Sequence, residues 1–147
     1  MTTSLLLDTN IISELRKGEK KANNNVWRYL GDPETRTDSP CYLSVITLGE
    51  LRRGVEMIRH RNDHSQAAVL DAWVTEVESD YSDHIIDIDK DVAKVWGLLT
   101  AKNPQNPLDK LIAATAIVYD MPVVTRNVKH FDSAVTVVDL FEETTPG

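Results

Sequence analysis

Short apolar runs that alternate with helical patterns constrain this chain more than any other feature of its sequence. The runs span 4–7, 41–44, 84–88, 121–125 and 135–138. A short run that is apolar throughout is typical of a strand covered on both faces, as in a parallel sheet. Strands that alternate with helices predict a three-layer α/β/α sandwich around a mainly parallel sheet of about five strands.

The segments between these runs carry apolar residues three and four positions apart, which predicts helices. We expect helices over 9–17, 22–30, 65–80, 89–101 and 108–119, and a further one from the end of the second run to about residue 60. Pro107 is suited to the first position of the last helix. Because the 147 residues show no repeat or linker, we expect one domain over 1–147, with its core at about 4–140.

The composition predicts a cytoplasmic protein that does not enter a membrane. Cys41 is the single cysteine, which excludes an internal disulfide and fits a reducing compartment. The apolar runs are too short to cross a bilayer, and the first residues lack the pattern of a signal peptide. The net charge of −7 either keeps the protein soluble or includes a local carboxylate cluster that a bound metal offsets.

Three acidic residues are expected where strands end and helices begin. Asp8 follows the first apolar run, Glu50 lies in the opening turns of the next helix, and Asp109 lies just after Pro107. Ligands bind at this edge of an open α/β sheet. Mg²⁺ prefers oxygen ligands, and clustered carboxylates repel one another without a cation. The positions therefore favour a Mg²⁺ site, where a metal can activate water against a phosphodiester.

The same acids also fit a purely structural role. Asp and Glu favour helix N-termini, where they complement the helix dipole and accept hydrogen bonds from free amides. Thr47 and Glu50 have the spacing of a capping box, and Asn106 is followed three residues later by Asp109. Because helix capping is the commoner use of such an acid, the spacing alone predicts an acidic edge without naming a reaction.

Four segments carry more specific motifs. They read Leu-Asp-Thr-Asn-Ile-Ile-Ser-Glu at 7–14, Ser-Val-Ile-Thr-Leu-Gly-Glu-Leu at 44–51, Asn-Pro-Leu-Asp-Lys-Leu-Ile-Ala-Ala-Thr-Ala at 106–116 and Val-Val-Thr-Arg-Asn at 123–127. Together they resemble the motifs of the PIN-domain family, and in particular the VapC-type toxins and their FitB-like relatives. Their order and spacing agree with the family over nearly the whole chain.

This resemblance implies an endoribonuclease that requires Mg²⁺, with Mn²⁺ as a substitute, and that acts as a homodimer. It implies that Asp8, Glu50 and Asp109 are the catalytic metal ligands, and that Thr9 and Asn10 support them through hydrogen bonds. In the family, metal-activated water attacks the phosphorus and leaves a 3′-hydroxyl and a 5′-phosphate. A cognate antitoxin blocks the site, and operator DNA is bound only through the toxin–antitoxin complex.

The chain departs from the family at a fourth acidic position. Relatives often have an acid at the place of Asn127 or a few residues later, near His130, and the next acid here is Asp132. Asn127 can supply a neutral oxygen, and Asp132 is either a replacement ligand or a solvated loop residue. The sequence therefore leaves open whether the site binds one metal ion or two. Arg126 either contacts the scissile phosphate or pairs with the acids at the surface.

Two other classes of function remain as alternatives. One is a noncatalytic binding module that kept the fold and lost its metal through the changes at Asn127 and His130. The other is a receiver-like phosphoacceptor domain, which also gathers acids and Mg²⁺ at the edge of a parallel sheet. Such domains usually have adjacent acids early in the chain and a late Lys-Pro pair, and this sequence has neither.

Overall fold

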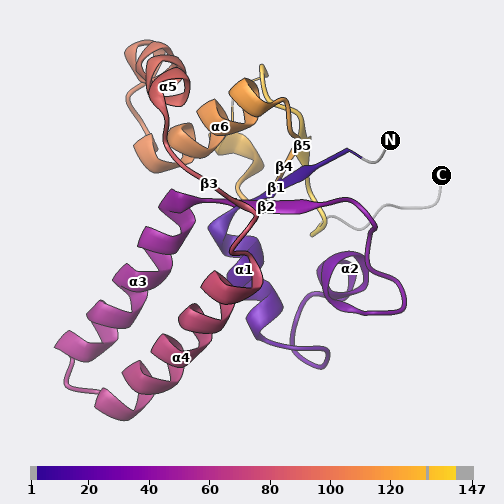
Figure 1. Ribbon diagram of the computed structural model, residues 1–147, viewed down its shortest axis with the longest axis vertical. Helices are drawn as coiled ribbons and strands as arrows, with labels where there is room; N and C mark the ends of the chain where they lie inside the picture. Colours follow the sequence, from indigo (N-terminus) through magenta and orange to yellow (C-terminus); the bar gives the residue numbers. More distant parts are fainter. Residues whose placement is uncertain (1–2, 132, 142–147) are drawn as a thin grey trace.

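The computed structural model describes residues 3–131 and 133–141, and these form one five-stranded sheet (Figure 1). The strands are β1 (Leu5–Leu7), β2 (Cys41–Ser44), β3 (Ile85–Ile86), β4 (Val123–Val124) and β5 (Val137–Val138). They lie in the order β3-β2-β1-β4-β5, and every neighbouring pair is parallel. The predicted parallel sheet of about five strands is therefore confirmed, with the first strand of the chain at its centre.

Helices cover both faces of the sheet (Figure 1). They are α1 (Thr9–Arg16), α2 (Asn24–Val26), α3 (Val45–His60), α4 (His64–Asp80), α5 (Lys90–Lys102) and α6 (Pro107–Tyr119), with a π-helical turn η1 (Trp27–Gly31) and a 3₁₀ turn η2 (Val128–His130). The first four helices lie on one face, and α5 and α6 lie on the other. This is the predicted three-layer sandwich. No helix in the described part of the chain is both long and apolar enough to span a membrane.

Strand β1 has two buried faces, which explains its uninterrupted apolar sequence. Successive side chains of a strand point to opposite faces. Leu5 and Leu7 belong to the core beneath α1–α4, whereas Leu6 belongs to the core beneath α5 and α6. All three leucines are buried. Burying each stabilises the fold by about 1.5–3 kcal/mol, so the central strand is the strongest anchor for the residue that follows it.

The segment 22–30 differs from the single helix predicted for it. Asn23 accepts hydrogen bonds through Oδ1 from the backbone N–H groups of Asn25 and Val26, at 2.9 and 3.2 Å. This is the action of an N-cap, so the helix begins at Asn24 rather than Ala22. After Val26 the backbone widens into the π-helical turn η1 instead of continuing as an α-helix.

The capping box predicted at Thr47 and Glu50 is wrong. Helix α3 already begins at Val45, because Ser44 Oγ accepts a hydrogen bond from the backbone N–H of Ile46 at 3.1 Å. Thr47 and Glu50 therefore lie inside the helix, where neither is needed to cap it. The helix end is satisfied by Ser44, and the Glu50 carboxylate is left for another role.

Candidate functional site

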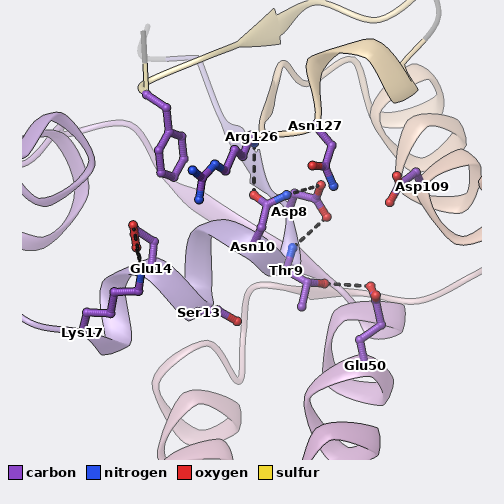
Figure 2. Close-up of a pocket in the computed structure, with 11 residues that line it drawn as sticks. Asp8, Thr9, Asn10, Ser13, Glu14, Lys17, Glu50, Asp109, Arg126 and Asn127 are labelled. Carbon is purple, nitrogen blue, oxygen red and sulfur yellow. Dashed lines mark hydrogen bonds and ion pairs between the residues drawn. The ribbon is translucent and has the colours of Figure 1, made fainter. Parts of the chain in front are cut away.

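Asp8, Glu50 and Asp109 line one cavity of about 390 Å³ at the carboxyl edge of the sheet (Figure 2). Asp8 directly follows β1, Glu50 lies on α3 and Asp109 lies on α6. Strands β2 and β4 flank β1, and α3 leaves β2 while α6 leads into β4. The strand order thus brings acids that are 42 and 101 residues from Asp8 to the walls of one hollow.

Asp8 is fixed by hydrogen bonds from α1 and from the residue that follows β4. Its side chain is buried, with the residue only 2% exposed. Oδ1 accepts a hydrogen bond from the backbone N–H of Thr9 at 2.7 Å, and Oδ2 accepts from the hydroxyl of Thr125 at 2.7 Å and from Asn10 Nδ2 at 3.3 Å. Burial raises the pKa of Asp8 above its ordinary value of 3.8, and the negative charge of Asp109 raises it further against these hydrogen bonds.

Glu50 is held by a short chain of hydroxyl groups. The hydroxyl of Thr9 donates to Glu50 Oε1 at 2.8 Å and lies 3.1 Å from the hydroxyl of the buried Thr47. Since the one hydroxyl proton of Thr9 goes to the carboxylate, Thr47 donates to Thr9. Burial raises the pKa of Glu50 above its ordinary value of 4.5, and the charges of Asp8 and Asp109 add to the rise. The three carboxylates are therefore close enough to repel one another.

Asp109 has a histidine partner. His130 Nδ1 on η2 lies 2.5 Å from Asp109 Oδ2, whose side chain is 18% exposed. A carboxylate accepts, so Nδ1 carries a proton in this contact. His130 stands where relatives often have an acid, and here it holds an existing acid instead. The sequence analysis noted that position 130 is a histidine and not an acid, but it did not predict the hydrogen bond from His130 to Asp109. Nothing in the residue spacing shows that η2 lies close to α6.

Of the residues predicted to support the site or bind substrate, Thr9, Asn10, Arg126 and Asn127 also line this cavity. Asn10 Oδ1 accepts a hydrogen bond from the backbone N–H of Arg126 at 3.1 Å, and the backbone N–H of Asn127 donates to Thr125 Oγ1 at 3.0 Å. The Arg126 guanidinium lies over the ring of Phe141, 4.7 Å from its centroid. In the described ranges, Arg126 pairs with no carboxylate, so the surface ion pair considered for it is not observed.

Glu14 is a fourth acid on the wall of the cavity that the sequence analysis did not identify (Figure 2). It is buried on α1, and Lys17 Nζ lies 2.7 Å from its Oε2 and donates to Oε1 at 3.2 Å. Its position three residues after Ile11 puts it on the buried stripe of α1, where an apolar residue is expected. An acid on an apolar stripe was the signal that could have found it.

The cavity offers oxygen ligands of the kind that Mg²⁺ prefers. Across residues 3–131 and 133–141, no three Asp, Glu, His or Cys side chains are already close enough together to hold one metal ion. The carboxylates therefore surround the cavity rather than meet at one point. Mg²⁺ commonly keeps several waters and takes only one or two carboxylates directly, so this arrangement suits a partly hydrated ion. Asp132, a predicted supporting residue, lies outside the described residues.

The sequence matches known proteins over most of its length. The family model described as PIN domain matches residues 5–135. The chain is 31% identical over 137 residues to plasmid stability protein StbB of Pseudomonas syringae pv. tomato, covering 88% of this chain and 92% of that protein. It is 28% identical over 127 residues to ribonuclease VapC1 of Rickettsia felis, covering 86% and 87%.

Solved structures share the fold as well. FitAcB from Neisseria gonorrhoeae matches with a TM-score of 0.77 and 27% identity, over 95% of this chain and 99% of that chain. A toxin–antitoxin complex from Klebsiella pneumoniae matches with a TM-score of 0.62 and 26% identity, over 95% and 100%. The similarity therefore extends over the whole of the sandwich and includes the edge that carries the acids.

Proposed function

The chain belongs to the PIN domain family, and from this premise we propose that it is a metal-dependent endoribonuclease, the toxin of a toxin–antitoxin pair. One observation carries the proposal: Asp8, Glu50 and Asp109 line a single cavity, and each is oriented by a different hydrogen-bond donor. The similarity to a protein named ribonuclease VapC1 supports the choice of RNA as substrate.

We expect Mg²⁺ as the cofactor, with Mn²⁺ as a substitute, held by Asp8, Glu50 and Asp109 either directly or through its bound waters. A divalent ion bound there supplies positive charge to the phosphodiester and lowers the pKa of an attacking water. The chain itself supplies the orientation: Thr125 fixes the Asp8 carboxylate, and Thr9 fixes Glu50. Such outer partners commonly change metal affinity or activity by about 10–100-fold when they are removed.

The RNA phosphate has its own cationic group at the cavity. Arg126 lines the cavity and is exposed, and no carboxylate among the described residues pairs with it. Its planar guanidinium can donate two parallel hydrogen bonds to phosphate oxygens. Asn127 adds a neutral amide at the same wall. We therefore assign substrate binding to Arg126 and a supporting role to Asn127.

The test is RNA cleavage by the Asp8→Asn variant with Mg²⁺ present. Because Asp8 is a proposed metal ligand, we expect its loss to lower the cleavage rate by about 100-fold or more, at least as much as the loss of an outer partner. Asp83→Asn is the matched control, since Asp83 is exposed and follows α4 outside the cavity. Circular dichroism should show both variants folded. Cleavage that is unchanged in a highly purified Asp8→Asn protein overturns the proposal.

Metal binding separates the nuclease from the noncatalytic module. Titration calorimetry with Mn²⁺ should show binding that Asp8→Asn weakens, and its stoichiometry should distinguish one metal from two. Failure to bind at millimolar Mn²⁺ favours the module. The receiver-like alternative has no support from the family match, which covers residues 5–135.

We further propose a homodimer and a cognate antitoxin as partners. The similarity to a toxin–antitoxin complex supports the antitoxin. Light scattering of the purified chain should give about twice its 16.5 kDa mass. Co-purification with the product of an adjacent short reading frame should inhibit cleavage, and operator DNA should be bound by that complex and not by this chain alone.

A further inference from the structure

A second, smaller cavity of about 120 Å³ lies next to the acidic one, and we call it the lysine cavity. Lys102, Lys110 and Lys129 line it together with Asn103 and His130, and none of its lining residues in the described part of the chain is acidic. The lysines come from three elements: the end of α5, the first turns of α6, and η2. In a chain with a net charge of −7, three lysines around one small cavity are a marked local reversal of charge.

Lys110 shows that this positive charge is built into the fold. The residue is only 8% exposed, and its Nζ donates a hydrogen bond to the backbone carbonyl of Gln105. An ammonium group has three protons to donate, and burying it is costly unless the charge is compensated. Within the described ranges, Lys102, Lys110 and Lys129 form no ion pair with any carboxylate. The lysine cavity is therefore suited to an anionic group that accepts hydrogen bonds.

The lysine cavity and the acidic cavity are joined through one contact. Asp109 lines the acidic cavity and is bonded to His130, which lines the lysine cavity. Asp109 and Lys110 are also consecutive residues of α6. An anion in the lysine cavity would therefore lie one side chain away from the place where we expect the scissile phosphate.

We propose that the lysine cavity binds a backbone phosphate of the RNA strand, beside the phosphate that is cleaved. A volume of about 120 Å³ is large enough for one phosphate group. Nucleic acid carries its charges at regular intervals along one strand, so it is suited to occupy both cavities at once. This inference rests on the proposed function, because it takes RNA as the substrate.

The test is the salt dependence of RNA binding by a double variant, Lys102→Gln with Lys129→Gln. Both residues are exposed, so the substitutions should leave the fold intact, whereas a change at the buried Lys110 could disturb it. Binding of a labelled single-stranded RNA is measured by fluorescence anisotropy in EDTA, where metal-dependent cleavage does not occur. Each lost phosphate contact lowers the slope of log K against log salt by about 0.7, so we expect a decrease of about 1.4 and an affinity several-fold weaker.

The matched control is Lys90→Gln with Lys94→Gln. This variant also removes two positive charges, here from exposed positions of α5, the helix that carries Lys102. Neither Lys90 nor Lys94 lines the lysine cavity. The control should keep the wild-type slope, and a Lys102→Arg with Lys129→Arg protein should largely retain affinity. Equal slopes for the wild type and the Lys102/Lys129 variant overturn the proposal, as does wild-type protein that does not bind RNA. If the variant instead loses binding only to an acidic partner protein, the cavity is a protein contact and the RNA proposal fails.

Cleavage kinetics separate this inference from the proposed function. The Lys102/Lys129 variant should raise KM and leave kcat close to the wild-type value, whereas Asp8→Asn should lower kcat. A lysine-dependent salt slope together with unchanged cleavage in Asp8→Asn would retain the phosphate site and remove the nuclease assignment. Loss of cleavage in Asp8→Asn, together with equal salt slopes for the wild type and the Lys102/Lys129 variant, would retain the nuclease assignment and remove the phosphate site.

Discussion

Asp8 combines two properties that usually exclude each other, because it is almost fully buried and yet has acidic neighbours on two helices. Three donors compensate part of that cost by hydrogen bonding to its carboxylate. Most residues that orient a metal ligand act in this way, by fixing a charged oxygen where the ion is to bind. The chemistry of the site therefore depends on these donors as much as on the acids.

The Thr125→Val substitution tests how far metal binding depends on one of these donors, the hydroxyl of Thr125. The substitution keeps the shape of the side chain and removes the hydroxyl that donates to Asp8 Oδ2 at 2.7 Å. We expect Mg²⁺ affinity to fall by about 10-fold, because the carboxylate loses its orientation. Calorimetric titration gives the affinity. Thr115→Val is the control, since Thr115 is equally buried and donates only to the backbone of its own helix; an equal loss there would contradict the assignment.

Stability of the metal-free protein should depend on pH through Asp8 and Glu50. Both pKa values are raised in the folded chain, mainly by burial, so the folded state binds protons more tightly than the unfolded state. The stability that these two groups contribute is therefore fully present at pH values below their ordinary pKa values of 3.8 and 4.5. It is lost as the pH rises through their raised pKa values in the folded state. Urea unfolding in EDTA should show wild-type stability falling relative to Asp8→Asn over this interval. A pH-independent difference between the two proteins would contradict the prediction.

At the scale of elements, the sequence predicted the strands and helices, because local apolar patterns and burial determine them. The apolar run of β1 predicted a strand covered on both faces, and the positions of Glu50 and Asp109 at the starts of helices predicted that they lie near one edge of the sheet. The partners of these acids were not predictable in the same way. Thr125 is 117 residues from Asp8 and His130 is 21 residues from Asp109, and both contacts depend on how the chain turns after β4. Turn geometry and side-chain direction have no periodic signal.

The start of α6 has a specific backbone requirement that can be tested. Asn106 precedes Pro107 with a φ of 53°, in the left-handed region, and its side chain makes no capping hydrogen bond. Asn and Gly accept this conformation, whereas a β-branched residue does not. We expect Asn106→Gly to keep the stability and Asn106→Val to lower the free energy of unfolding by about 1–2 kcal/mol. Urea denaturation measures both, and equal stability of the two variants would show that the backbone can relax.

At the scale of the whole molecule, the acidic cavity should couple metal binding to stability. A ligand at about 100 times its Kd stabilises the native state by about 2.7 kcal/mol, which corresponds to a rise in Tm of about 5–10 °C for a chain of this size. Mg²⁺ should produce this shift in the wild type and in Asp83→Asn, and much less of it in Asp109→Asn. Sodium chloride at equal ionic strength is the second control, and an equal shift with sodium would attribute the effect to screening alone.

The hydrogen bond between Thr125 and Asp8 also has a consequence for the order in which the parts of the site can form. Asp8 precedes Thr125 by 117 residues, and Thr125 directly follows β4, the strand that pairs with β1. A nascent chain that ends before Thr125 has the first acid without its main donor, and a chain that ends before His130 has Asp109 without its partner. The acids are therefore fully oriented only in a chain in which β4 has paired with β1 and η2 has packed near α6.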